Sequence, residues 1–205
     1  MTLKLNSSSS GSVSFVAPAS TTAGADINLA LPVDGGTLDR LERAGNILQV
    51  KQTHLTTRFS VSYSADTATA VTGLNVSITP SSTANKILVF ARMSCEFNTT
   101  SHHENIFGLS RNGTNIGLTS DSVGSRRVGL ANLTYGFHGI DATSTQDSVS
   151  FNYLDSPSLT SSLTYQVYFN IGSGSNCYVN RTLNDGDSSS HEWLTSSITA
   201  MEVAG

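Results

Sequence analysis

From Asn46 to the end of the sequence, apolar and polar residues alternate in short runs that are separated by turn-forming residues. The most regular run spans 162–171, and one of its faces is formed by Leu163, Tyr165, Val167, Phe169 and Ile171. A period of two predicts a strand with one buried face. The run KILVFARMSCEF at 86–97 is apolar on both faces over 87–91, which predicts a strand covered on both sides.

Similar runs follow one another almost without interruption. Candidate strands span 47–52, 57–63, 74–78, 86–97, 105–111, 115–118, 127–137, 148–154, 162–171, 177–181 and 196–203. Ser-, Thr-, Asn- and Asp-rich clusters such as TPSSTAN and TLNDGDSSS separate them, and helical crossovers that could join parallel strands are lacking. The pattern predicts an all-β fold, an antiparallel jelly-roll β-sandwich over 46–205.

The stretch GLSRNGTNIGL at 108–118 predicts a hairpin. Asn112 and Gly113 stand between two alternating segments, and both residue types adopt the positive φ of a type I′ turn. Asn112 also begins an N-x-T triplet, but more than a quarter of the chain is Ser or Thr, so such triplets are expected by chance. We interpret RNGT as a turn.

The first 36 residues predict an extended arm. Two short alternations are separated by a Pro-, Ser-, Thr- and Gly-rich connector, and each is too short to hold a core of its own. We expect this arm to be held by its own globular domain, by sister chains or by a larger assembly. Its candidate attachment residues are Val13, Phe15, Ile27, Leu29 and Leu31.

The stretch TLDRLERAG at 37–45 predicts a short linker helix, because Leu38 and Leu41 lie one turn apart and Gly45 is a suitable stop. Two turns do not fold alone. The helix either packs on the main domain or joins sister helices around a symmetry axis. The predicted organisation is therefore an arm (1–36), a linker helix (37–45) and a sandwich domain (46–205).

Composition limits the classes of partner that we expect for the chain. Charged residues form only 13% of the chain, the net charge is −4, and the 11 basic residues are scattered, so a basic nucleic-acid face is not expected. Apolar runs stay too short to span a bilayer, and the N-terminus lacks the pattern of a signal peptide. We expect neither nucleic-acid binding nor membrane insertion, and assembly without export.

Two cysteines, Cys95 and Cys177, fall in separate predicted strands. They form a disulfide if those strands face each other, whereas separate buried thiols are the commoner state in a reducing cytosol.

The sequence offers few candidate metal-binding or catalytic residues. Neighbouring His102 and His103 point to opposite faces of a strand and cannot readily chelate one ion, and Asp185 and Asp187 lack the bidentate Glu of a calcium loop. Nucleophile-elbow, HExxH and P-loop motifs are absent from the sequence. We expect no enzyme activity, no cofactor and no metal, with one alternative: a single His from each subunit on a three-fold axis.

Several short sequence segments resemble those of a known protein family. They are GNILQVKQ, TGLNVSITPSSTANKILVFARMS, GLSRNGTNIG, NYLDSPSLTSSLTYQVYFNI, NRTLNDGD and SSITAMEV. Together they make residues 46–205 resemble tail-fibre-like virion structural proteins of tailed bacteriophages, especially cyanophages, and the opening segment resembles the N-terminal segments of such appendages. The resemblance implies a virion protein assembled in the host cytoplasm, with other phage capsid or tail proteins as partners.

The C-terminal part is also similar to trimeric jelly rolls of the tumour necrosis factor and C1q type, in which the first and last strands lie together in the inner sheet. That similarity implies a homotrimer with both ends of the domain at one pole and the long connecting loops at the other. Candidate residues for a subunit seam are Tyr63, Phe90, Tyr135, Tyr153 and Tyr168.

Three functions follow as hypotheses. The first is a trimeric fibre or knob that is anchored by its arm and contacts a host surface glycan or protein. The second is a capsid decoration (cement) protein that stabilises the phage head. The third is a carbohydrate-binding module. Candidate residues for surface contact are Tyr178, Asp185, Asp187 and Trp193.

Overall fold

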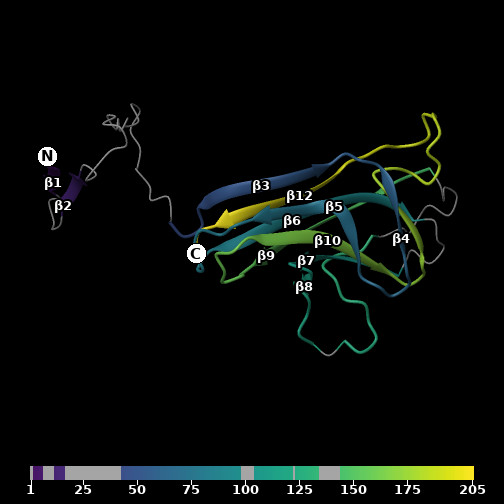
Figure 1. The fold of residues 1–205 in the computed structure, drawn as a ribbon, viewed down its shortest axis with the longest axis horizontal. Coiled ribbons are helices and arrows are strands. Elements are labelled where there is room, and N and C mark those ends of the chain that lie inside the picture. The colour runs from purple at the N-terminus through teal and green to yellow at the C-terminus, as the bar shows by residue number, and fades with distance from the viewer. Residues whose placement is uncertain (1, 7–11, 17–42, 98–103, 122, 134–143) are drawn as a thin grey trace. The chain divides into compact units, whose positions relative to one another are not determined.

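The computed structural model describes residues 2–6, 12–16, 43–97, 104–121, 123–133 and 144–205 (Figure 1). The chain divides into two units, Met1–Asp39 and Arg40–Gly205. Within the described residues every strand pair is antiparallel and helices are absent, so none is available to cross a membrane.

The smaller unit contains a two-stranded hairpin. β1 (Thr2–Asn6) pairs with β2 (Ser12–Val16), and Leu3 stands opposite Phe15. The first alternation of the predicted arm is thus β2, and its partner β1 was not expected from the sequence. The second alternation, with Ile27, Leu29 and Leu31, lies outside the described residues. So does most of the predicted linker helix, whose described end, 43–45, leads into a turn.

The larger unit is a sandwich of two antiparallel sheets. One sheet has the order β5-β10-β7-β8, and the other contains the neighbours β3-β12-β6-β9. Their bounds are β3 (Ile47–Leu55), β5 (Thr69–Ile78), β6 (Lys86–Phe97), β7 (Asn105–Arg111), β8 (Thr114–Ile116), β9 (Asp147–Asp155), β10 (Leu163–Ile171) and β12 (Ser196–Val203). Eight strands in these two orders form a jelly roll, as predicted.

Two further strands extend the second sheet. β11 (Ser175–Val179) pairs with the last residues of β6. It lies on the same side of β6 as β12, which pairs with the earlier residues of that strand. β4 (Phe59–Tyr63) then pairs with β11 at the edge.

The core lies between the sheets and follows the alternation in the sequence. All five residues of the predicted buried face of β10, from Leu163 to Ile171, are fully buried. They pack against the inward residues of β6, and an aromatic cluster joins the sheets where the ring centroids of Tyr63 and Phe169 lie 5.2 Å apart. Apolar periodicity thus determines which side of each strand faces inward.

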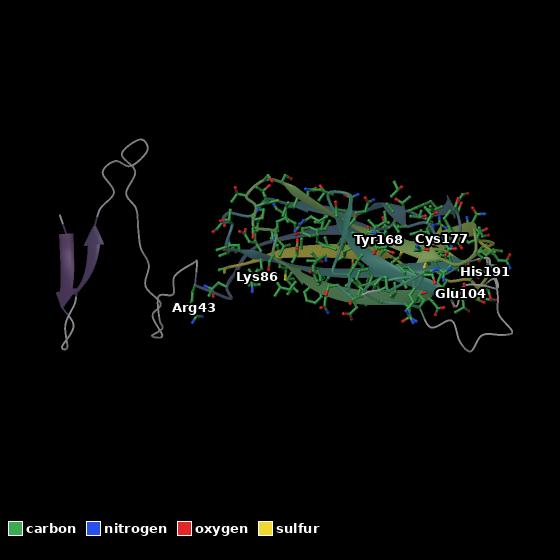
Figure 2. The ribbon with its side chains drawn as sticks, turned by 90° about the horizontal axis from the view of Figure 1, so that it is seen from below. Arg43, Lys86, Glu104, Tyr168, Cys177 and His191 are labelled. Atoms are coloured by element: carbon green, nitrogen blue, oxygen red, sulfur yellow. The ribbon has the colours of Figure 1, made fainter. Side chains whose placement is uncertain are left out.

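Both ends of the larger unit lie at one pole. Ile47 of β3 pairs with Val203 of β12, Gly45 N donates to Ala204 O, and Ala204 N donates to Asn46 O, each at 2.9 Å for the two backbone bonds. Figure 1 shows the C-terminus beside the start of β3. We call this end the terminal pole and the opposite end, which carries the longer loops, the distal pole. Figure 2 shows Lys86 and His191 at these two ends.

A buried carboxylate ties the terminal pole together. Glu202 is 1% exposed and accepts hydrogen bonds from Gln49 Nε2 (2.5 Å), from Ser81 N (2.6 Å) and Oγ (2.7 Å), and from Asn85 Nδ2 (2.6 Å). Burial alone would raise the pKa of Glu202, but these donors outweigh it, so the pKa lies below its ordinary value.

A second polar cluster links the two sheets. Arg111 of β7 donates to both oxygens of Asp155 on β9, at 2.9 and 2.7 Å, and the hydroxyl of Tyr165 on β10 donates to Asp155 at 2.7 Å. Burial of the phenol, followed by its bond to Asp155, raises the pKa of Tyr165. The charged group is thereby satisfied within the sandwich.

The Asn112-Gly113 turn is confirmed. Both residues have positive φ, 49° and 83°, and Arg111 pairs with Thr114 across the turn. Thr164 N donates to Asn112 Oδ1 at 2.8 Å, which ties the tip to β10.

Two expectations from the apolar pattern were wrong. Of the predicted strand 127–137, the described part makes only an isolated bridge between Ala131 and Phe107, and Gly129 lies so close that an added Cβ would be 2.7 Å from Phe107 O. The strand 86–97 is exact in its bounds, but over 87–91 only one face is covered within this chain, because Phe90 on the other face is 43% exposed.

Cys95 and Cys177 are both free and fully buried. They lie on paired strands, where Cys177 is opposite Phe97 and Cys95 is opposite Val179. Burial, then the neighbouring thiol, raises the pKa of Cys177.

Candidate functional site

The loop 181–195 leaves the second sheet between β11 and β12 and returns at the same place. Asn180 N donates to Ser94 O at 3.0 Å, and Ser94 N donates to Ser196 Oγ at 3.0 Å, so Asn180 and Ser196 flank one residue of β6. Ser196 Oγ donates to Asn180 Oδ1 at 2.6 Å. This pair closes the neck of the loop, and the φ of 60° at Asn180 turns the chain out of the strand.

The neck is anchored further to the neighbouring strands. Asn180 Nδ2 donates to Leu55 O (2.8 Å) and Thr57 O (2.9 Å), between β3 and β4. Asn180 is fully buried, so each polar atom of its side chain has a partner inside the protein.

The loop folds over the distal half of the sheet on the side turned away from the core, which we call the outer face. Leu183 N donates to Glu96 Oε2 at 2.6 Å, and Arg92 donates to Thr195 O at 2.6 Å. Gln146 Nε2 donates to Glu192 O at 2.6 Å. Glu96 is an outer-face residue of β6 that is nevertheless fully buried, which shows that the loop excludes water there.

Trp193 stands on this loop with its ring fixed and exposed. Its indole N–H donates to Asp185 Oδ1 at 2.7 Å, and the guanidinium carbon of Arg58 lies 3.3 Å from the ring centroid. The residue is nevertheless 58% exposed. An exposed aromatic ring held by a hydrogen bond and a cation–π contact is typical of a binding surface.

Asp185 links Trp193 to two arginines. Its Oδ1 lies 3.6 Å from Arg58 Nη1, and its Oδ2 lies 3.3 Å from Arg181 Nη1. Arg181 in turn donates to Thr182 O and Leu183 O, both at 3.0 Å, and its guanidinium lies 5.0 Å from the Tyr178 ring centroid. The two arginines therefore offset the charge of Asp185 and hold the loop in shape.

A hollow of about 390 Å³ opens beside Trp193. It is lined by Asp185, Gly186, Asp187, Ser188, His191 and Trp193. His191 Nδ1 donates to Gly186 O at 2.9 Å; a carbonyl only accepts, so Nε2 of the neutral ring is left as an acceptor. Arg58, whose guanidinium carbon lies 3.3 Å from the indole centroid, is not among these lining residues. We call this feature the Trp193 hollow.

The structure brings together three of the four residues proposed for surface contact. Asp185, Asp187 and Trp193 line the Trp193 hollow, and Tyr178 lies outside it, beneath Arg181. Sequence reasoning did not identify Arg58 and His191. The four-residue spacing of Arg181 and Asp185 was readable from the sequence, but the contact of Arg58 with Trp193 depends on the pairing of β4 with β11.

The candidate seam residues fall in different environments. Tyr63 is buried in the core, and Tyr168 is buried on the other face of β10, beside Gly108. Both side chains are therefore covered within the chain itself, without a second subunit. Burial, followed by the nearby Cys177 and Cys95, raises the pKa of Tyr63. Tyr153 is partly buried against the core, Phe90 is exposed, and Tyr135 lies outside the described residues.

The terminal half of the outer face carries an apolar patch. Val50, Met201, Leu88 and Leu154 are opposite one another on β3, β12, β6 and β9, so they form a row across the sheet. Phe90 stands in the next row. Val50 is 54% exposed and Leu154 is 47% exposed. We call this set the apolar row.

Across the described ranges, no three His, Cys, Asp or Glu residues are placed to hold a metal ion, and His102 and His103 lie outside those ranges.

No protein-family model and no curated protein matches the chain. Among solved structures it is similar to VP2 of infectious bursal disease virus. A mutant VP2 from T=1 particles is 16% identical with a TM-score of 0.36, the Gx strain structure is 15% identical with 0.35, and a VP2 subviral particle is 12% identical with 0.36. Each match covers 95% of this chain but only 45%, 47% and 46% of the other chain, respectively.

Proposed function

We propose that the chain is a non-enzymatic virion structural protein of a tailed bacteriophage, a homotrimeric fibre or knob that is assembled in the host cytoplasm. Residues 1–36 anchor it to other virion proteins of the capsid or tail, and the distal pole contacts the host surface. The proposal combines the sequence resemblance over residues 46–205 with one observation of the structure, the apolar row.

The apolar row supports self-association. A sheet face that is covered on one side only normally carries polar residues on the other side, yet Val50, Leu88 and Leu154 continue the apolar pattern outward. Contiguous exposed apolar surface marks interaction sites, and interfaces between identical subunits are more apolar than the remaining surface. A second copy covers such a face without any other partner, and the number three is proposed from the similarity to trimeric jelly rolls.

The meeting of the first and last strands of the larger unit supports an appendage. Asn46, which precedes β3, and Ala204, which follows β12, share a backbone hydrogen bond at the terminal pole. Attachment through the preceding residues therefore leaves the distal pole, with the loop 181–195, free to meet another surface. A binding loop on a rigid sandwich is a common arrangement for recognition.

The test uses the phage whose genome encodes the chain. Deletion of residues 1–36 is expected to remove the protein from purified particles, measured by mass spectrometry, while the shortened protein still self-associates. Particles that lack the protein are expected to adsorb poorly to host cells. Particles that retain the shortened protein in normal amounts would contradict the role of the arm.

A decoration (cement) protein is the second candidate, since residues 43–205 form one sandwich and a repetitive shaft is not present among the described residues. In that case the depleted particles adsorb normally but break on heating or in low salt. Comparing adsorption with heat stability on the same depleted particles separates the two roles.

A further inference from the structure

We propose that the Trp193 hollow binds an uncharged pyranose ring of a surface glycan, which stacks on the indole. This inference deepens the proposed host contact and rests on it. The hollow of about 390 Å³ falls within the range of small-ligand sites and is large enough for a single sugar ring.

The indole is prepared before a ligand arrives. Its N–H is bonded to Asp185 and one side is covered by Arg58, so rotation of the ring is restricted. Because the ring is already ordered, little side-chain entropy is lost on binding. Trp193 lines the hollow, and the apolar C–H face of a pyranose matches a flat indole ring.

Two of the polar groups at the rim offer acceptors. Asp187 has no hydrogen bond or ion pair to any described residue, and Nε2 of His191 accepts when the ring is neutral. Sugar hydroxyls donate to such groups. The uncompensated carboxylate of Asp187 repels a carboxylate on a ligand, which disfavours acidic sugars.

Stacking of a cation on the indole is also disfavoured. The guanidinium carbon of Arg58 lies 3.3 Å from the ring centroid, and its charge weakens the attraction of the indole for a second cation. An uncharged ring with several hydroxyls therefore fits the hollow best.

Trp193 is the single tryptophan of the chain, so its fluorescence reports on the hollow directly. The full chain is titrated with the methyl glycosides of glucose, galactose, mannose and N-acetylglucosamine, and with methyl glucuronide. We expect a saturable change in emission with at least one neutral glycoside, at a Kd of roughly 1–10 mM, and binding of the glucuronide that is about tenfold weaker.

Two variants and a control sharpen the test. Asp187→Asn is expected to reduce the preference for the neutral sugar roughly fivefold. Asp121→Asn, an exposed carboxylate outside the hollow, leaves the preference unchanged. Trp193→Ala is expected to abolish the saturation-transfer NMR signal of the neutral glycoside while the far-UV circular dichroism stays unchanged.

The proposal is overturned if no neutral glycoside changes the emission up to about 100 mM, or if the glucuronide binds as tightly as the neutral sugars. A trimer that enters particles but fails this test keeps the proposed function and loses the glycan site. A monomer that binds sugar keeps the site and loses the appendage.

Discussion

Glu202 shows how one buried carboxylate can fix the end of a domain. Its carboxylate accepts one hydrogen bond from β3 and three from the 79–85 loop, whose last residue, Asn85, donates one of them. Asn85 Oδ1 also accepts a hydrogen bond from Gly205 N at 3.1 Å. The terminal pole is where the chain both enters and leaves the sandwich. A charge at this position therefore joins the first and last strands to one loop.

Glu202→Gln is expected to lower the free energy of unfolding by about 2–3 kcal/mol at neutral pH, because donors that served a carboxylate lose a charged acceptor. The pKa of Glu202 in the folded protein lies below its ordinary value of 4.5, so its contribution is complete above that value and is lost as the pH falls through the lowered pKa.

Urea denaturation of both proteins between neutral and acid pH checks this expectation. The difference in stability between wild type and Glu202→Gln should shrink below the ordinary pKa of 4.5. Asp121→Asn serves as an exposed control with no such trend. A constant difference across the whole pH range would show that the charge of Glu202 contributes nothing.

Asn180 controls an element, the loop 181–195. Asn180→Ala removes the bonds to Leu55, Thr57 and Ser196 and places a Cβ-bearing residue without a compensating side chain at a φ of 60°. Asn180→Gly removes the same bonds but accepts that φ. We expect the alanine variant to lose about 3 kcal/mol and the glycine variant about 1 kcal/mol less.

Thermal unfolding ranks the stabilities of the two Asn180 variants, and Trp193 emission reports whether the loop 181–195 stays folded. If the glycine variant proves the less stable of the two, the positive φ of Asn180 does not limit stability.

The hairpin between β7 and β8 tests local turn chemistry. Gly113 has φ 83°, and an added Cβ would meet nothing within 4 Å, so only backbone strain opposes a side chain. Gly113→Ala is expected to cost about 1–2 kcal/mol in chemical denaturation. Gly113→Asn should cost distinctly less, because Asn tolerates this region; equal costs would contradict the turn as the source.

The sequence predicted the positions of the strands better than it predicted which segments contact one another. β6 and β10 follow directly from alternation, since inward residues such as Val89 and Val167 repeat every second position. Alternation says nothing of which strands pair, so the contact of Arg58 with Trp193 was not predictable. It also could not show that Leu130 and Ala131 form backbone hydrogen bonds with Phe107 without belonging to a strand.

At the scale of the whole molecule, the outer side of β6 is informative. The apolar outward residues of β6 predicted a strand covered on both sides, and the single chain leaves one side open at Phe90. The expectation fails for the isolated chain, and we infer that sister copies supply the missing cover.

Substitutions on the apolar row are expected to separate the subunits without unfolding them. Leu154→Asp and Val50→Asp each place a carboxylate on a side chain that is half exposed already, so far-UV circular dichroism should not change. Leu118→Asp, at a leucine that is 41% exposed next to the opposite sheet, is the matched control.

The mass of the full chain in solution, measured by light scattering, tests self-association most directly. We predict about 65 kDa, three times the 21.6 kDa of one chain, for the wild type and for Leu118→Asp. Leu154→Asp and Val50→Asp should have the mass of one folded chain. A wild-type protein that stays at 21.6 kDa at every concentration would contradict the account.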